Sequence, residues 1–437
     1  MQADQLAGMR ENLNALFHEC VAHLAHSHQI RVLYALQTLV GVIRAVYKKC
    51  VQLSGFDLVN LLIGFDRAEQ EMAISLAHVN RFLMADSPAC LKDLCLKLLL
   101  VLASGSDNIS NNTLVEFLMI NSDKLFDSLI QLLTQSGLRS RHGRAAVTVL
   151  TLLVQYRKYD SSNPYILRLS ILDQELSLHG YSQVVTGSLA EYTAAYEASL
   201  ADGGGSGWFG AITNMVGNMF VSEDSQIRNE KMRSHNPSLL ALYEIIHLNR
   251  IFITTLAHYQ TEEQVPQVPA PAEEGQQVED NKSTSSQPED NLRSVNLLVT
   301  FLEYISIAMQ DTKSDVAHNN VTLCFIILAC VTEDQYATAL MHDPNLVFKV
   351  KLHRTPMRHR KAGVDTTPNH GRSLVCALLD LMIEFIRCKV NIQHILLCFY
   401  IDDKMFRSHL MKRLPIDLHL LALSCIHRLL VYQKRCR

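Results

Sequence analysis

The chain has 437 residues, of which 48% are hydrophobic and 19% charged, and its formal net charge is −3. A balance so close to neutral gives no reason to expect a nucleic-acid partner. The first ten residues lack the basic and apolar regions of a secretory signal. Eleven cysteines without a C-x-x-C pair are typical of reduced cytosolic thiols rather than of a disulfide framework.

Residues 1–201 carry apolar side chains at helical spacing almost throughout, and strands are not expected. Gly143–Tyr156 joins small residues to a Leu/Val stripe, which is typical of inner helices in stacked repeats. Comparable runs recur at Cys90–Leu102, Gly371–Cys388 and Pro415–Tyr432, but their spacing is irregular. The pattern predicts an all-α fold, an armadillo/HEAT-like helical solenoid with degenerate repeats of about 40–47 residues and disordered insertions. A compact helical bundle is the alternative.

Residues 202–222 form a Gly-rich segment that contains the only tryptophan and has no charged residue from Gly203 to Ser222. A large apolar face opposite a small uncharged face is typical of a lipid-packing sensor. The alternatives are a core helix docked on its own protein and a flexible loop. The face expected to insert into a membrane or a partner comprises Trp208, Phe209, Ile212, Met215, Val216, Met219 and Phe220.

The middle of the chain alternates helical and polar stretches. Residues 223–260 read as a helical repeat, in which Asn236-Pro237 is expected to open a strong helix. Residues 261–290 are acidic and Pro/Ser-rich, too polar to bury a core, and are interpreted as a disordered linker. Residues 291–342 resume helical repeats. Their densest apolar run, Val321–Val331, is shorter than the roughly 20 residues of a membrane span and is interpreted as a buried helix.

Residues 343–370 are interpreted as a basic loop, followed by C-terminal helical repeats over 371–437. The loop has no acidic residue between Lys349 and Gly363, so it suits an anionic membrane surface or an acidic partner. A solvated loop is the alternative. The expected basic surface comprises Lys349, Lys351, Arg354, Arg358, Arg360 and Lys361.

Catalytic motifs are missing from the sequence. Gly205, Gly207 and Gly210 match a dinucleotide fingerprint but follow a helical run instead of a strand. His18 and His23 are five residues apart, so they cannot share one helix face as zinc ligands do. We therefore expect no enzyme, no catalytic residue, no cofactor and no metal. The alternatives are an enzyme with an unrecognised Cys/His-based site and a membrane-spanning helical protein.

Three stretches carry a family resemblance: Ile166–Val221, whose start reads I-L-R-L-S-I-L-D-Q-E-L-S-L-H-G-Y-S-Q-V-V, together with Lys349–Arg360 and Ser373–Tyr400. They resemble the armadillo-like helical domain-containing proteins associated with the Golgi, whose members carry further helices ahead of the matching region. The resemblance implies a cytoplasmic and Golgi membrane-associated scaffold without enzymatic activity. It also implies two protein partners, phosphatidylinositol 4-kinase beta and the Golgi Arf guanine-nucleotide exchange factor, and roles in Golgi organisation and protein secretion.

Overall fold

The structure is a computed structural model. It describes residues 8–49, 55–106, 108–160, 162–201, 222–258, 296–310, 312, 314–354, 363–365, 371–389 and 416–435. Within these ranges the ordered elements are helices and one short hairpin, so the all-α prediction is confirmed. The Gly/Trp segment, apart from Ser222, and the acidic linker lie outside the described residues.

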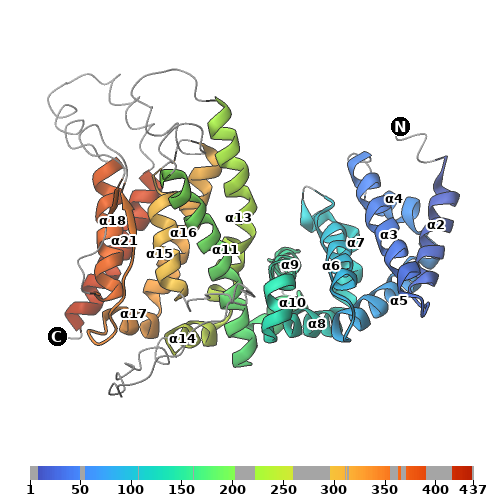
Figure 1. Ribbon diagram of the computed structural model, residues 1–437, viewed down its shortest axis with the longest axis horizontal. Coiled ribbons are helices and arrows are strands. Elements are labelled where there is room, and N and C mark those ends of the chain that lie inside the picture. The colour runs from blue at the N-terminus through green and yellow to red at the C-terminus, as the bar shows by residue number, and fades with distance from the viewer. Residues whose placement is uncertain are drawn as a thin grey trace, which may run out of the picture.

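The described helices recur in a fixed order of three, and each position in that order builds one row of the molecule (Figure 1). In the first row each helix packs on the next one of the same row. The first row consists of α2 (Arg10–His23), α5 (Phe65–Met84), α8 (Ser122–Thr134), α11 (Glu175–Ala201), α15 (Leu297–Ala308) and α18 (Leu374–Lys389).

The second row runs the length of the array in the same neighbour-to-neighbour manner. It consists of α3 (Gln29–Lys49), α6 (Ala89–Ser104), α9 (Ser136–Gln155), α13 (Ser222–Leu248), α16 (Asp315–Glu333) and α21 (Ile416–Arg435). Figure 1 places α2 and α3 at one end of the array and α18 and α21 at the other. This is the elongated stacking of a solenoid.

The third row is built from short helices of seven to nine residues. It consists of α4 (Gly55–Leu62), α7 (Thr113–Ile120), α10 (Pro164–Ser170), α14 (Arg250–His258) and α17 (Gln335–His342). One short and two longer helices per unit follow the three-helix armadillo pattern rather than the two-helix HEAT pattern. A single-turn helix η1 (Ile109–Asn111) precedes α7.

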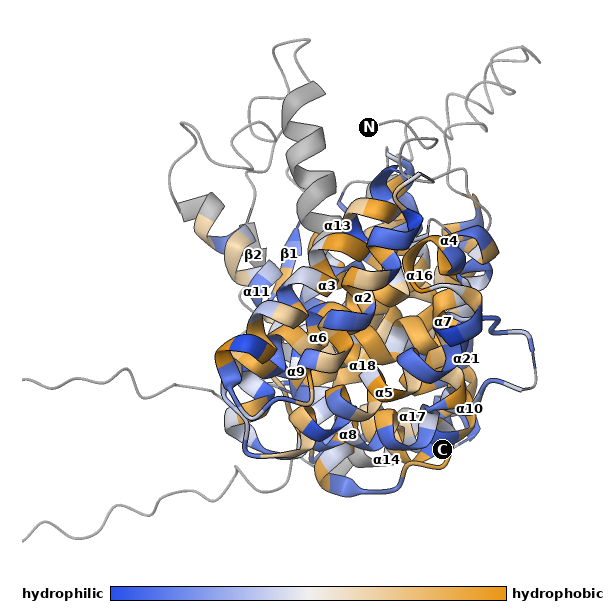
Figure 2. Ribbon diagram, turned by 90° about the vertical axis from the view of Figure 1, so that its right-hand side faces the viewer, coloured by the Kyte–Doolittle hydropathy of each residue, from blue (hydrophilic) through white to orange (hydrophobic). Residues whose placement is uncertain are grey.

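The apolar faces of the three rows enclose one continuous core that extends from Phe17 in α2 to Leu429 in α21. Figure 2 looks along the array from its N-terminal end and shows apolar residues between the helices and hydrophilic residues on their outer turns. Each unit therefore buries its apolar surface against its neighbours, and burial of about 25 cal/mol per Å² supplies most of the stabilisation.

One predicted helix start is wrong, and the small-residue run at Gly143 lies inside a helix. α9 begins at Ser136, seven residues ahead of Gly143. Gly143 instead marks a close approach of α9 to α11, where a Cβ atom would lie 2.6 Å from Val184 Cγ2. α13 begins at Ser222, so Pro237 lies inside it rather than in its first turn. Gly143 and Pro237 thus both lie inside their helices rather than at the first turn.

Buried polar side chains hold successive helices together in the N-terminal half. Lys92 of α6 donates from Nζ to the carbonyl oxygens of Phe82, Leu83 and Ala85, with the last distance 2.7 Å. Asn163 caps α10 by accepting from the Tyr165 N–H at 2.9 Å.

The Asn163 amide also donates to three carbonyl oxygens at the C-terminal end of α9, at distances of 2.7 to 3.4 Å from Nδ2. These carbonyls lie ten, nine and seven residues before Asn163, the same offsets that Lys92 uses. Asn112 repeats the arrangement between α6 and α7 with the first two offsets. The last carbonyls of a helix, which lack a partner inside the helix, are thereby satisfied within the core.

Candidate functional site

The expected basic loop is where the structure departs from helical stacking. Its described part forms β1 (Leu352–Arg354) and β2 (Gly363–Asp365), an antiparallel pair that sequence reasoning did not predict. Of the expected basic surface, Lys349, Lys351 and Arg354 are described, whereas Arg358, Arg360 and Lys361 lie outside the described residues. All seven residues of the expected insertion face, from Trp208 to Phe220, also lie outside them.

The edge of β1 that faces away from β2 is satisfied by side chains of α15. Glu303 Oε1 accepts the Lys351 N–H at 2.9 Å, and Ser306 Oγ accepts the His353 N–H at 2.9 Å. Gln310 donates from Nε2 to the His353 carbonyl oxygen at 3.4 Å. Glu303 and Ser306 lie three residues apart on one face of α15, and Gln310 follows two residues past its end. These side chains therefore bond three backbone groups of this edge in place of a third strand.

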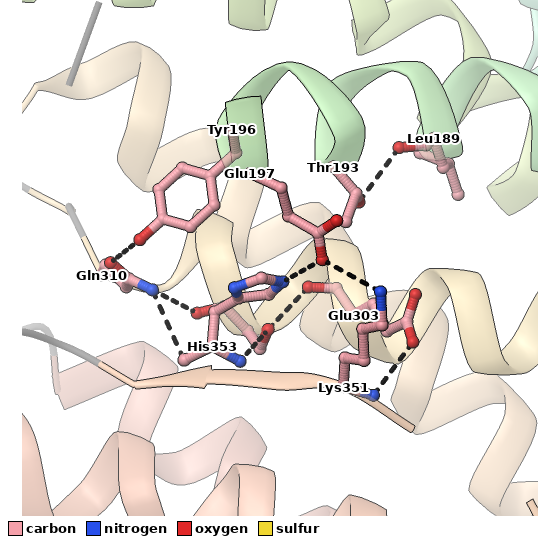
Figure 3. Close-up of polar contacts among 9 residues, drawn as sticks. Leu189, Thr193, Tyr196, Glu197, Glu303, Gln310, Lys351 and His353 are labelled. Carbon is pink, nitrogen blue, oxygen red and sulfur yellow. Dashed lines mark hydrogen bonds and ion pairs between the residues drawn. The ribbon is translucent and has the colours of Figure 1, made fainter. Parts of the chain in front are cut away.

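His353 projects from β1 toward α11, as Figure 3 shows, and its side chain is only 1% exposed. Its Nε2 lies 3.5 Å from Glu197 Oε1, and the Tyr196 ring stands edge-on to the imidazole at 5.1 Å. The Tyr196 hydroxyl donates to Gln310 Oε1 at 3.0 Å. Burial lowers the pKa of His353 and outweighs the opposing charge of Glu197. The imidazole is therefore neutral at pH 7.

Glu197 also forms an ion pair with Lys351, whose Nζ lies 3.5 Å from Glu197 Oε1. Lys351 is 59% exposed, so this ion pair is screened by water and contributes little stability. Burial raises the pKa of Glu303, and the neighbouring Lys351 opposes that rise. Lys351 thus contacts α15 through its backbone N–H and α11 through its ammonium group, beside β1.

A small pocket of about 190 Å³ lies between β1, α15 and α18. The pocket is lined by His353 and Arg354 of β1 and by Asp380, Glu384 and Arg387 of α18. Arg372 donates from Nη1 to Asp380 Oδ2 beside it. The volume is below the range of about 300–1,000 Å³ typical of small-molecule sites. The pocket is therefore smaller than a typical substrate site.

The buried and half-buried thiols among the described cysteines do not suit a cysteine-based reaction, whereas Cys90 and Cys376 are exposed. Burial raises the pKa of the Cys95 thiol to about 12 and raises the pKa values of Cys20, Cys330 and Cys425 as well. A thiol must be deprotonated to act as a nucleophile or a metal ligand, and burial in apolar surroundings opposes that. Within the described ranges, no group of three or more His, Cys, Asp and Glu residues could hold a metal ion.

Two described helices, α3 and α16, are long and apolar enough to cross a membrane by length and composition alone. α16 extends beyond the expected apolar run Val321–Val331, and half of its apolar window is buried in the array. It also carries Asn320, whose amide donates to the Tyr304 hydroxyl at 2.9 Å and to Asn236 Oδ1 at 3.0 Å. Contacts on several sides and a buried polar network favour a core helix.

The residues that build this junction could not be found as a motif, because Glu197, Glu303 and Lys351 come from distant parts of the chain. One local signal was present. α15 is strongly apolar, yet Glu303, Ser306 and Gln310 stand on one of its faces or just past its end. Polar residues at helical spacing in an otherwise buried helix indicate a specific polar partner.

No protein-family model matches the chain, and no solved structure matches it significantly. Armadillo-like helical domain-containing protein 3 of Danio rerio is 42% identical over the whole chain, and that of Homo sapiens is also 42% identical. The protein of the same name from Xenopus laevis is 43% identical. In each case the chain spans 61% of the length of the relative. The chain is therefore similar along its whole length to a protein named for the armadillo-like helical fold described here.

Proposed function

We propose that this chain is a non-enzymatic scaffold that gathers partner proteins on the cytoplasmic face of the Golgi membrane. The observation that carries the proposal is the unbroken second row, α3 to α21, which stacks six helices side by side along the described array. Extended stacks of this kind present long surfaces on which other proteins bind. A pocket too small for most substrates and unreactive buried thiols are consistent with a binding role.

The expected partners are phosphatidylinositol 4-kinase beta and the Golgi Arf guanine-nucleotide exchange factor. Their support is the family resemblance of the sequence, to which the full-length identity of 42% with armadillo-like helical domain-containing protein 3 adds weight. By recruiting these two enzymes the scaffold would support Golgi organisation and protein secretion. The Golgi and the partners are proposals on this basis.

Binding between purified proteins tests the partner proposal directly. The full 437-residue chain is immobilised, and each partner is passed over it at concentrations up to about 10 µM, a range that detects interactions of about −7 kcal/mol or stronger. We expect saturable binding of at least one partner and none to an unrelated helical-repeat protein. Absence of binding to both partners would overturn the proposal. A tagged chain expressed in cells should also colocalise with a Golgi marker.

Membrane contact through residues 202–222 is a separate proposal, supported by the uncharged amphipathic pattern of that segment. Liposome flotation should be greatly reduced by Trp208→Asp combined with Met215→Asp, because two carboxylates on the apolar face oppose its burial. Thr213→Asp with Asn214→Asp adds the same charge on the polar face and serves as the matched control. Equal flotation of the apolar-face variant and the parent would refute membrane insertion.

Attraction of the basic loop to anionic lipids is tested in the same assay. Lys349→Glu with Arg354→Glu should weaken flotation on vesicles that contain phosphatidylserine and leave flotation on neutral vesicles unchanged. Added salt should reproduce the loss, because electrostatic attraction is screened over about 8–10 Å at physiological ionic strength. Flotation that is insensitive to both salt and the charge reversals would remove the loop from the membrane contact.

A further inference from the structure

The last helix of the second row, α21, is apolar on two opposite faces. One face is buried against the array and is formed by residues spaced three or four apart: Leu418, Ala422, Cys425 and Leu429. The other face is open and is formed by four large aliphatic residues that are 45% to 60% exposed: Ile416, Leu420, Leu423 and Leu430. Single exposed apolar residues are common on proteins, but a stripe along one whole helix is not.

This composition is that of an interior helix. In the same row α6, α9, α13 and α16 each pack between two neighbours of that row, whereas among the described helices of the row α21 packs on α16 alone. A helix with apolar residues on both sides is built to be covered on both sides. The open stripe of α21 is therefore suited to packing against another helix.

The spacing of the open stripe fits a second α21. Ile416, Leu420, Leu423, His427 and Leu430 follow steps of four, three, four and three residues, the heptad pattern of paired helices. When two copies run antiparallel with their centres at residue 425, Leu420 of one lies opposite Leu430 of the other. In the same register Leu423 lies opposite His427. Ile416 of each copy then lies opposite Lys434 of the other, so the stripe meets itself over Leu420–Leu430.

The charges of α21 select the antiparallel direction. Asp417 stands in its first turn, and Lys434 and Arg435 stand in its last turn. Antiparallel pairing brings Asp417 of each copy to the basic end of the other, and it also opposes the two helix dipoles favourably. Parallel pairing would place like charges together at both ends, which is unfavourable.

We propose that α21 is the contact between two copies of this chain, paired antiparallel about a two-fold axis. The second row then continues from α16 and α21 of one copy into α21 and α16 of the other, and two arrays are joined end to end. Such a contact is isologous and closes on itself, so it yields dimers and not filaments. Its size lies in the small class, below about 1,200 Å² in total, so the dimer dissociates on dilution.

Sedimentation of the full chain from about 1 to 100 µM tests the proposal, a range suited to reversible contacts of this size. We expect a monomer–dimer equilibrium and a loss of dimer of at least tenfold in Leu420→Asp with Leu423→Asp. The matched control is Leu167→Asp with Ile171→Asp, which replaces one residue of α10 and the residue just after it, 63% and 65% exposed. Circular dichroism confirms that both variants keep the parental helix content. A parent that is monomeric throughout, or a dimer that survives the α21 changes, would overturn the proposal.

Charge reversal tests the direction of the helices independently. Asp417→Lys alone, and Lys434→Asp with Arg435→Asp, should each weaken self-association because like charges then meet at both ends. Mixing the two variants should restore association, measured as energy transfer between donor- and acceptor-labelled chains. A parallel pair would already set like charges together in the parent, so the weakening of each variant alone identifies the antiparallel direction, and restoration on mixing shows that these charges lie in the contact. A mixture that associates no better than either variant alone would refute this arrangement.

Discussion

The N-terminal units and the β1–α15 junction solve one physical problem in different ways. Both must satisfy backbone hydrogen-bonding groups that are removed from water. In the N-terminal units, Lys92 and Asn163 reach carbonyls only seven to ten residues earlier in the chain. At the junction, β1 is held by α15 residues that lie 43 to 48 positions away, and by Glu197, which lies 154 positions from Lys351.

The two regions differ in how many helices must pack before their hydrogen bonds can form. Lys92 and Asn163 each bond the last carbonyls of the preceding helix, an arrangement we call a clasp. A clasp can form as soon as its two helices meet, because its donor and acceptors share one short stretch of chain. The hairpin can dock only after α11 and α15 have packed together. We therefore expect changes in the clasps to lower the stability of the whole array and changes at the junction to act locally. The following variants test this contrast, from the largest effect to the smallest.

Lys92→Met should cause the largest loss, about 3 kcal/mol in the free energy of unfolding. Methionine fills similar space but leaves three carbonyls at the end of α5 without their charged donor. Burial lowers the pKa of Lys92, yet the three carbonyls hold its ammonium group. Urea unfolding measures the effect, with the exposed Lys97→Met on the same helix as control. Equal stability of the two variants would show that the clasp is not needed.

Asn163→Asp should cost about 2 kcal/mol although aspartate is itself a good helix cap. The carboxylate still accepts from the Tyr165 N–H but cannot donate to the carbonyls at the end of α9. The change therefore separates the cap from the clasp. Thermal unfolding is the measurement, and the exposed Asn319→Asp on α16 is the control. A variant as stable as the parent would assign the whole role of Asn163 to capping.

Ser306→Ala with Gln310→Ala should cost about 1 kcal/mol or less in global stability. It removes the partners of the His353 N–H and carbonyl group, so β1 should detach locally. Hydrogen exchange of a peptide that spans Lys351 and His353 should accelerate, while exchange in α6 and α9 stays at the parental rate. Gln335→Ala in α17 controls for a nearby change outside the junction. Faster hydrogen exchange throughout the array would show that the junction affects global stability, contrary to the prediction.

His142 and His353 place one buried imidazole in each region, and burial lowers the pKa of both. The unfolded chain binds a proton at each site below about pH 6.5, whereas the folded chain resists it. Stability should therefore be full above pH 6.5 and fall as the pH is lowered from there toward 5. Melting temperatures at pH 7.5, 6.5 and 5.5 measure this slope, which His142→Gln should flatten. An equal slope in the variant would exclude His142 as a source.

Sequence periodicity predicted the helices and the stacked architecture, because apolar spacing is set by the same burial that builds the core. It could not reveal the three-row order. Segments between helices vary greatly in length, from the single residue that separates α13 and α14 to the 38 that separate α14 and α15, so the units have no fixed period. β1 escaped notice because it spans only three residues and owes its position to Glu303, Ser306 and Gln310 rather than to strand propensity.

The neighbour-by-neighbour packing of the second row has a mechanical consequence. In the second row, a structural change at α3 reaches α21 only through each intervening helix. We expect the change to become smaller at each step, because each repeat contacts only its neighbours and can relax locally. If two of the proposed partners dock at distant positions along the array, we therefore expect each to bind with an affinity that does not depend on the other.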